Sequence, residues 1–325
     1  RCSYCWPYAR SDRKDHRPTE LCLKTIDEIK RQARENGFNS FHFSLSGGEP
    51  TFHPGYLDIL HHLANDVENT NYTSVHMTSN CSRPMRWFEQ YVECVKPFHR
   101  ASITASLHTE HLNTTEKLQD FADKLILCQE HDVQVTINMV MVPDWFERDW
   151  ENALFFHEQG INVTLKPQSD PTASRIVEGY KEEDLKRLWN GMPQRAYTEN
   201  KRKWEGRPKP SFEIPQGVDG KLDTSIPWHM QVEFRDSTGK KWYMDQAERF
   251  NAFDFNKFKG WNCNAGYQGI IIREPDGSVK RSYSCHDVPL GNIETGFKLF
   301  DKPMPCMTES CVSSADSKIP KRKYV

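Results

Sequence analysis

Two cysteines close to the start of the chain are the first residues whose type and spacing indicate chemistry. Cys2 and Cys5 stand in the run Arg-Cys-Ser-Tyr-Cys, and a Cys-x-x-Cys pair allows two thiolates to bind one metal centre. A second run, Ser-Gly-Gly-Glu-Pro at residues 46–50, follows the short apolar segment Phe41–Leu45. Its glycines allow the backbone to approach a ligand closely, because they carry no side chain. Taken alone, the cysteine pair is also typical of half a zinc site, and the glycine run of a tight strand–helix turn.

Together the two runs resemble the sequences of the radical S-adenosylmethionine (radical SAM) enzymes. In that family a Cys-x-x-x-Cys-x-x-Cys motif holds a 4Fe–4S cluster through three thiolates, and S-adenosylmethionine (SAM) chelates the iron that has no cysteine. Cys2 and Cys5 match the second and third cysteines of the motif, and Tyr4 stands where family members usually carry an aromatic residue. We therefore expect the first cysteine three residues before Arg1, and the first strand of the domain before that cysteine.

The resemblance also implies which residues bind SAM. In the family the Gly-Gly-Glu-Pro run contacts the methionine amino group, so Glu49 is expected to be either the charged contact or its structural support. Polar residues after the later strands are expected to contact the ribose. The expected catalytic residues, which are also cluster ligands, are Cys2 and Cys5, and the expected SAM-binding residues are Tyr4, Gly47, Gly48, Glu49, Pro50, Asn80, Ser106 and Asn138.

For the polar residues at the strand ends, two interpretations remain open. A hydrogen bond inside the protein explains Asn80, Ser106 or Asn138 as well as a ligand contact does. Cys81 is either a hydrogen-atom donor to a substrate radical or, as most lone cysteines are, a small buried hydrophobic residue. A structural role is favoured over substrate contact for four other residues near strand ends: His53, His108, Lys166 and Gln168.

Four cysteines near the other end of the chain form a second group: Cys263, Cys285, Cys306 and Cys311. A glycine and a predicted hairpin follow the first of them, which resembles the SPASM and twitch extensions of radical SAM enzymes. The resemblance implies one auxiliary 4Fe–4S cluster, because four thiolates complete a single cluster. Zinc is the alternative, since it binds four thiolates equally well.

Apolar and amphipathic runs alternate over residues 21–166, which predicts βα units around a parallel sheet. The predicted strands are Phe41–Leu45, Ser74–Thr78, Ala101–Ser106, Gln134–Met141 and Asn162–Lys166. The predicted helices are Leu21–Asn36, Tyr56–Glu68, Met85–Val95, Thr115–His131 and Asp149–Gln159, two of them ended by Gly37 and Gly160. The resemblance adds a first strand, so the fold class expected is α/β: a partial (β/α)6 TIM-like barrel whose first strand is missing, with chemistry at the carboxyl ends of its strands.

Beyond Pro167 the sequence changes in character. Residues 180–189 predict a short helix, and residues 195–215 are rich in charge and proline and predict a loop. Two hairpins are predicted, one from residues 231–234 and 241–244, the other from 269–273 and 278–283. Lys318–Val325 is basic and is expected to be a solvated tail.

Three regions follow from these patterns. Residues 1–170 are expected to form the radical SAM core, and residues 171–255 a connecting region with a helix and a hairpin. Residues 256–325 are expected to form a small α+β domain for the auxiliary cluster.

The composition fits an ordinary globular protein, with 37% hydrophobic and 27% charged residues. A formal net charge of −2 gives no reason to expect nucleic acid or an anionic membrane as a partner, and the apolar runs are too short for a membrane span. Its 10 cysteines are grouped towards the two ends with single ones between them, which favours metal ligation and reduced thiols over disulfides. A reducing, cytoplasmic location is therefore expected.

The expected function is reductive cleavage of SAM to a 5′-deoxyadenosyl radical that removes a hydrogen atom from a substrate, with a flavodoxin or ferredoxin as electron donor. A peptide or protein substrate is the first hypothesis, by analogy with other enzymes that carry such extensions. A small molecule such as a sugar is the second. A non-catalytic protein with two zinc sites is the alternative from another class.

Overall fold

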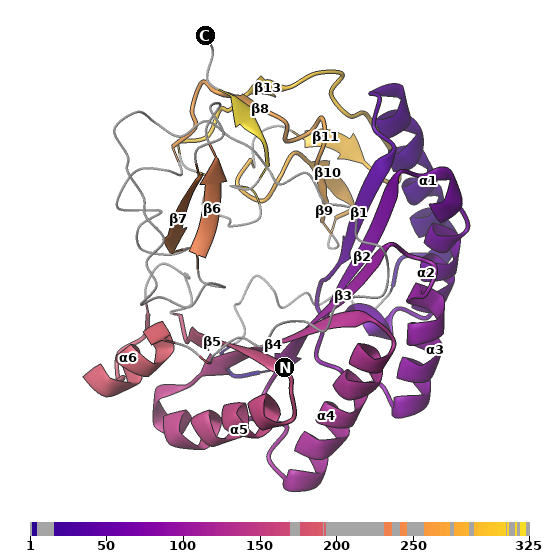
Figure 1. Ribbon diagram of the computed structural model, residues 1–325. Helices are drawn as coiled ribbons and strands as arrows, with labels where there is room; N and C mark the ends of the chain where they lie inside the picture. Colours follow the sequence, from indigo (N-terminus) through magenta and orange to yellow (C-terminus); the bar gives the residue numbers. More distant parts are fainter. Residues whose placement is uncertain are drawn as a thin grey trace. The chain divides into compact units, whose positions relative to one another are not determined.

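Five parallel strands form the central sheet in the computed structural model of the protein, in the order β1-β2-β3-β4-β5 (Figure 1). The strands are β1 (Ser40–Leu45), β2 (Tyr72–Ser79), β3 (Arg100–Leu107), β4 (Val133–Met141) and β5 (Asn162–Pro167). Strands that are neighbours in the sheet are also consecutive in sequence, so each connection crosses over the sheet as in a TIM-like barrel. The predicted partial α/β barrel is confirmed.

The structure describes residues 2–4, 16–169, 176–190, 192, 257–273, 276–285, 289–309, 311, 316 and 319–322, and the backbone of 231–235 and 241–245. The predicted loop over residues 195–215 lies outside the described residues. The chain divides into two units, residues 1–23 with 40–205 and residues 24–39 with 206–325. Helix α1 (Thr19–Glu35) therefore contributes its first residues to one unit and the rest to the other.

Four helices connect the strands and lie on one face of the sheet (Figure 1). They are α2 (Tyr56–Ala64), α3 (Met85–Val95), α4 (Thr115–Glu130) and α5 (Phe146–Glu158), and the predicted elements are confirmed to within a few residues. Gly37 and Gly160 adopt φ angles of +83° and +85° after α1 and α5, the left-handed conformation that ends a helix. No helix among the described residues is long and apolar enough to cross a membrane.

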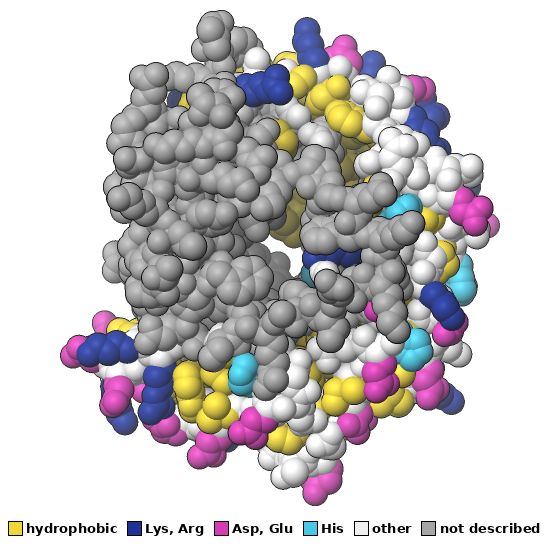
Figure 2. Space-filling model, viewed as in Figure 1, with side chains coloured by type: hydrophobic (Ala, Val, Ile, Leu, Met, Phe, Trp, Pro, Cys, Tyr) yellow, Lys and Arg dark blue, Asp and Glu magenta, His cyan; other side chains and the backbone are white. Residues whose placement is uncertain are grey.

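The two faces of the sheet differ in chemistry. Exposure alternates along the strands, so that Ile103, Ala105 and Leu107 on β3 are buried while Ser102, Thr104 and Ser106 are partly exposed. β4 follows the same alternation, with buried Val135 and Ile137. The apolar face packs against the helices, and the opposite face is lined by hydroxyl, amide and imidazole groups. Figure 2 shows acidic and basic side chains interspersed along the outer surface that the helices form.

The strands of the second unit form small antiparallel sheets. One has the order β12-β11-β10-β9, a second has the order β13-β8-β14, and a third consists of β6 and β7. The strands are β8 (Asn262–Cys263), β9 (Ile271–Ile272), β10 (Ser278–Lys280), β11 (Pro289–Asn292), β12 (Gly296–Phe297), β13 (Met304–Pro305) and β14 (Lys321–Arg322). Both predicted hairpins form: β9 pairs with β10, and β6 (Gln231–Arg235) pairs with β7 (Lys241–Asp245). The predicted short helix is α6 (Glu182–Asn190).

The solvated tail predicted for residues 318–325 is wrong at Lys321. This lysine lies on β14, pairs with Cys263 of β8 and is 1% exposed. Burial of a lysine is unusual, because its charge must be compensated inside the protein. The basic composition of the segment gave no sign of this.

Candidate functional site

The carboxylate of Glu49 connects the ends of β1 and β2. Its Oε1 accepts hydrogen bonds from the Thr51 hydroxyl at 2.7 Å, the Ser79 hydroxyl at 2.8 Å and the Thr51 backbone amide at 3.2 Å. Its Oε2 accepts a bond of 2.6 Å from the backbone N–H of Asn80. Both oxygens are thus engaged by the protein itself, which favours the structural role over a direct ligand contact for Glu49.

The two glycines before Glu49 leave open space beside the backbone. A Cβ atom built at Gly47 or Gly48 would meet no atom within 4 Å. Gly47 has a φ of +155°, which disfavours any side chain there, whereas Gly48 carries no such restriction. The backbone at Gly48 is therefore accessible to a ligand.

The segment that contains Cys2 lies at the carboxyl end of β3. The backbone N–H of Ser3 donates to the Glu110 carboxylate at 2.8 Å, and the Tyr4 hydroxyl lies 2.8 Å from Nδ1 of His108. Glu110 and His108 both follow the last residue of β3, so this segment is held where a barrel enzyme has its chemistry. Cys5 lies outside the described residues.

His108 is kept in its neutral form by its surroundings. Burial, followed by the influence of His111, lowers the pKa of His108, while burial raises the pKa of Tyr4. A neutral imidazole can accept a hydrogen bond from the Tyr4 hydroxyl at Nδ1, and its own proton is then on Nε2. His108 thereby positions the aromatic residue of the cysteine motif, a role that the sequence did not indicate.

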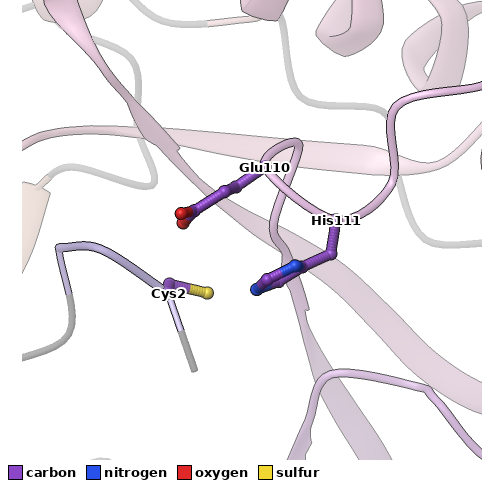
Figure 3. Close-up of side chains that lie close together, drawn as sticks. All are labelled: Cys2, Glu110 and His111. Carbon is purple, nitrogen blue, oxygen red and sulfur yellow. The ribbon is translucent and has the colours of Figure 1, made fainter.

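Cys2, Glu110 and His111 form a group of potential metal ligands. Their metal-binding atoms lie within 4.8 Å of one another, and Figure 3 shows the Glu110 carboxylate and the His111 ring both directed towards the Cys2 thiol. Sequence reasoning missed Glu110 and His111, because they belong to a loop of ordinary composition. Cys2 is thus held in a polar environment that suits a metal-bound thiolate.

Ser106 and Asn138 lie next to each other on neighbouring strands. Ser106 of β3 is in register with Asn138 of β4, which is in register with Thr164 of β5. All three are partly exposed on the face of the sheet that the helices leave open. Thr164, which was not predicted, completes this row of polar side chains. One layer below, Thr104 and Thr136 are paired in the same way.

Several other candidates have internal partners. Nδ1 of His53 accepts from the Gly55 N–H at 3.1 Å and its Nε2 lies 2.9 Å from the Arg17 carbonyl, so both ring nitrogens are used. Cys81 is 2% exposed, and burial raises the pKa of its thiol to about 12. Cys81 therefore lacks the access that a hydrogen-atom donor needs. Lys166 is exposed near the end of β5, and Gln168 follows that strand.

The four cysteines of the second unit are buried and none forms a disulfide. Cys263, Cys306 and Cys311 belong to one apolar cluster that also contains Phe258, Trp261 and Ala265. Cys285 is adjacent to Ser284, which forms a hydrogen bond with Cys311. The structure thus brings three of the predicted ligands together directly and places the fourth beside them.

The spacing of these cysteines differs from that of a single-metal site. Zinc–sulfur bonds of about 2.3 Å place the sulfurs of a tetrahedral site roughly 3.8 Å apart. Among the described residues, the group with ligand atoms within 4.8 Å is Cys2, Glu110 and His111, and the four buried cysteines do not form such a group. A four-iron cluster is larger and holds its cysteines farther apart.

Comparison with protein families agrees with this geometry. Residues 1–157 match the family model described as the radical SAM superfamily. This segment belongs to the radical SAM superfamily. The match includes Cys2, the Gly-Gly-Glu-Pro run and strands β1–β4, and the superfamily carries out SAM-dependent radical chemistry.

A solved structure with a similar fold covers most of the chain. This structure, titled "Native anSMEcpe with bound AdoMet and Kp18Cys peptide", has a TM-score of 0.50 at 16% identity, covering 91% of this chain and 74% of that one. Another, "Native anSMEcpe with bound AdoMet", has a TM-score of 0.47 at 17% identity, covering 91% and 75%. Comparison with curated protein sequences found no match. The family match thus covers the central sheet up to β4, and the chain continues into an additional carboxyl-terminal unit.

Proposed function

We propose that this radical SAM enzyme holds its 4Fe–4S cluster through Cys2, Cys5 and the third cysteine that the motif requires, and modifies a peptide or protein. When bound, the cluster and SAM supply a 5′-deoxyadenosyl radical that removes a hydrogen atom from the substrate. The observation that carries the proposal is the convergence of three segments at the strand ends. Glu49 connects the ends of β1 and β2, and the Cys2–Tyr4 segment is bonded to residues at the end of β3.

Each of these segments has a role that its geometry supports. Gly48 offers accessible backbone to the amino acid part of SAM. Glu49 fixes the shape of that turn, since its oxygens already accept bonds from Thr51, Ser79 and Asn80. Such positioning is what a radical enzyme requires, because the reactive group must meet one hydrogen atom and no other.

The polar row contributed by β3, β4 and β5 is suited to the SAM ribose. Ser106, Asn138 and Thr164 offer hydroxyl and amide groups in one register layer, next to the carboxyl ends of the strands. Both hydroxyl and amide groups can donate and accept, which matches the diol of a ribose. Asn80, whose side-chain oxygen accepts from the Ser82 N–H at 3.0 Å, retains its amide NH2 group as a donor.

The second unit is proposed to hold one auxiliary 4Fe–4S cluster through Cys263, Cys285, Cys306 and Cys311. Their burial as free thiols in one region supports a cluster. A fully cysteine-bound cluster has no open iron, so its role is electron transfer or substrate positioning.

The peptide substrate is supported by the solved structure with the Kp18Cys peptide, whose fold resembles this chain. A second candidate is a small polar molecule such as a sugar. The hydroxyl-rich open face of the sheet, with Thr78, Thr104 and Thr136 in one layer, supports this alternative.

Iron analysis and SAM cleavage test the proposal on the full-length protein, reconstituted without oxygen. We expect about eight irons per chain, and about four after replacing Cys263, Cys285, Cys306 and Cys311 by alanine. Cys2→Ala together with Cys5→Ala should also leave about four irons and should abolish formation of 5′-deoxyadenosine.

The controls separate the two clusters and the two metals. Cys94→Ala and Cys128→Ala change buried cysteines on α3 and α4 and should leave the iron content unchanged. About four irons in the unmutated protein, or zinc retained after reconstitution, would exclude the auxiliary cluster. Incubation with peptide libraries and with sugars, followed by mass spectrometry of the products, distinguishes the two substrate classes.

A further inference from the structure

Two buried cations lie beside the cysteine group of the second unit. Lys321 is 1% exposed and Arg281 is 2% exposed, although lysine and arginine are rarely buried. Nζ of Lys321 donates to the carbonyl of Asp316 at 2.7 Å and of Ile319 at 2.8 Å, and it lies 4.8 Å from the centre of the Phe258 ring. Carbonyl oxygens and an aromatic face are favourable partners for a buried ammonium group.

Lys321 is also placed directly opposite an expected cluster ligand. On the antiparallel pair β14–β8, Lys321 is in register with Cys263, so their side chains lie on the same side of the sheet. On the other side of β8, Met304 pairs with Cys263, and Cys306 continues that strand pair through its N–H bond of 2.7 Å to the Trp261 carbonyl. The ammonium group thus stands at the edge of the group of thiols.

Charged groups lie close to these thiols among the described residues. They include the cations Lys321 and Arg281 and the carboxylate of Asp316. The Asp316 carboxylate accepts a bond of 2.6 Å from the Ser284 N–H.

Arg281 differs from Lys321, because its side chain connects backbone segments. Its guanidinium donates to three backbone carbonyls, those of Ala265 at 3.0 Å, Pro305 at 3.1 Å and Met304 at 3.2 Å. These bonds connect the segment that follows Cys263 with the segment that precedes Cys306, so Arg281 supports the local fold. Lys321 is the cation whose charge can be changed with less effect on the backbone.

We propose that Lys321 is a positioning residue that compensates the negative charge of the metal-bound cysteines and sets the reduction potential of the auxiliary cluster. This inference rests on the proposed function, which supplies the cluster. Four thiolates around a 4Fe–4S centre carry a net negative charge, and reduction adds one more electron. A buried cation stabilises the more negative, reduced form and so raises the potential, strongly so in a medium of low dielectric constant.

The experiment uses the full-length protein with Cys2→Ala and Cys5→Ala, so that the auxiliary cluster is observed alone. In this background Lys321→Gln keeps a hydrogen-bond donor but removes the charge, and Lys321→Arg keeps the charge. Lys302→Gln changes an exposed lysine of the same unit and is the matched control. Iron content, circular dichroism and a redox titration followed by electron paramagnetic resonance are measured for each protein.

We expect Lys321→Gln to shift the midpoint potential to more negative values at unchanged iron content. Lys321→Arg and Lys302→Gln should keep the potential of the background. An unshifted potential in Lys321→Gln overturns the inference, as does a shifted potential in a folded Lys321→Arg protein. If Lys321→Gln does not fold, the midpoint potential of Lys321→Arg is compared with that of the background protein instead.

Failure of the proposed function gives a different result. If the background protein takes up no iron, the auxiliary cluster is excluded, and the lysine is tested with zinc instead. Lys321→Gln should then lower the affinity for Zn²⁺ at least about tenfold relative to Lys302→Gln, because the metal-bound thiolates lose their compensating charge. Equal zinc affinities for the two variants overturn the inference in that case too.

Discussion

The carboxylate of Glu49 connects the chain segments at the ends of β1 and β2. It accepts bonds from the Thr51 and Ser79 hydroxyls and from the backbone N–H of Asn80. A carboxylate in this position replaces the backbone pairing that the strands lose as they diverge into their loops. The sequence left Glu49 as either the charged contact or its structural support, and these hydrogen bonds favour the support.

Glu49→Gln should destabilise the fold by about 1–3 kcal/mol, because the amide group of glutamine faces a donor where the carboxylate accepted a bond. Urea unfolding of the wild type and the variant measures the difference. Glu68→Gln, at an exposed position between α2 and β2, is the control and should change the stability by less than about 0.5 kcal/mol. Equal stability of Glu49→Gln and the wild type would contradict the structural role.

Gly48→Val should weaken SAM binding without unfolding the protein. The valine side chain enters open space, since a Cβ at residue 48 meets no atom within 4 Å. It blocks the approach of a ligand to the backbone. SAM affinity by equilibrium dialysis and the melting temperature are the two measurements.

Gly266→Val provides the contrasting control for this test. A Cβ there would lie 2.7 Å from the Phe300 ring at a φ of +87°, so this variant should lose stability. Wild-type SAM affinity in Gly48→Val would mean that residues 47–50 form only a turn.

Residue types indicated part of the candidate site, and proximity in the structure added further candidates. Cys2, Gly48, Glu49, Ser106 and Asn138 were expected from motifs and from polar positions on apolar strands. Thr164, Glu110 and His111 were missed, because each is an ordinary residue whose importance comes from its neighbours on other elements. Cross-strand register and loop conformation cannot be obtained from spacing along a single chain.

At the scale of elements, the alternation of short apolar runs with amphipathic helical runs was sufficient to predict the parallel sheet. The predicted helix boundaries differ from the observed ones where a short separate turn lies next to the helix. Helix α2 ends at Ala64, before a separate turn at Val67–Asn69, and α5 begins at Phe146 because the turn at Pro143–Trp145 leads into it. Alternation of residue types along a strand indicates that the sheet has two different faces. It does not predict that imidazole and hydroxyl groups are paired on the polar face.

His76 and Ser102 form such a pair between β2 and β3, with 2.8 Å between Nδ1 and the hydroxyl oxygen. Burial, and then Arg100, lowers the pKa of His76 below its usual value of about 6.5. The unfolded chain therefore binds a proton at a higher pH than the folded protein does. Stability is lost as the pH falls from about 6.5 through the lower pKa of the folded state.

His76→Gln should make the loss of stability between pH 7.5 and 5.5 smaller than in the wild type, because glutamine does not titrate. Urea midpoints at the two pH values measure the effect. His61→Gln, at an exposed position on α2, is the control. The same pH dependence in His76→Gln and the wild type would show that this imidazole does not contribute.

At the scale of the whole molecule, helix α1 belongs to both units of the chain. Its residues from Lys24 onward are grouped with the carboxyl-terminal unit, and Gln32 is 6% exposed. The Gln32 side chain donates to the Phe297 carbonyl at 3.0 Å and accepts from the Leu299 N–H at 2.7 Å. Asn36, directly after the helix, donates to the Phe300 carbonyl at 2.8 Å, so two side chains of this region satisfy backbone groups of residues 297–300.

This arrangement could not be read from the sequence, which places α1 within the first βα unit. The hydrogen-bonded residues are 264 and 265 positions apart in the sequence, and amides such as Gln32 and Asn36 have no preferred partner that a pattern could reveal. The consequence is that the carboxyl-terminal unit includes a helix from the start of the chain. The integrity of that unit, and of any cluster in it, therefore depends on α1.

Gln32→Ala should open the segment around Leu299 without affecting the central sheet. The Leu299 N–H loses its acceptor in a buried position, which costs about 1–3 kcal/mol and increases local exchange about tenfold or more. Hydrogen–deuterium exchange of Phe297–Phe300 measures this, with strands β2 and β3 as internal reference. Arg31→Ala is the matched control, because Arg31 is its neighbour on α1 and pairs with the exposed Glu28 and Glu35. Unchanged exchange at Leu299 in Gln32→Ala, or an equal increase throughout β2 and β3, would contradict the dependence of the carboxyl-terminal unit on this helix.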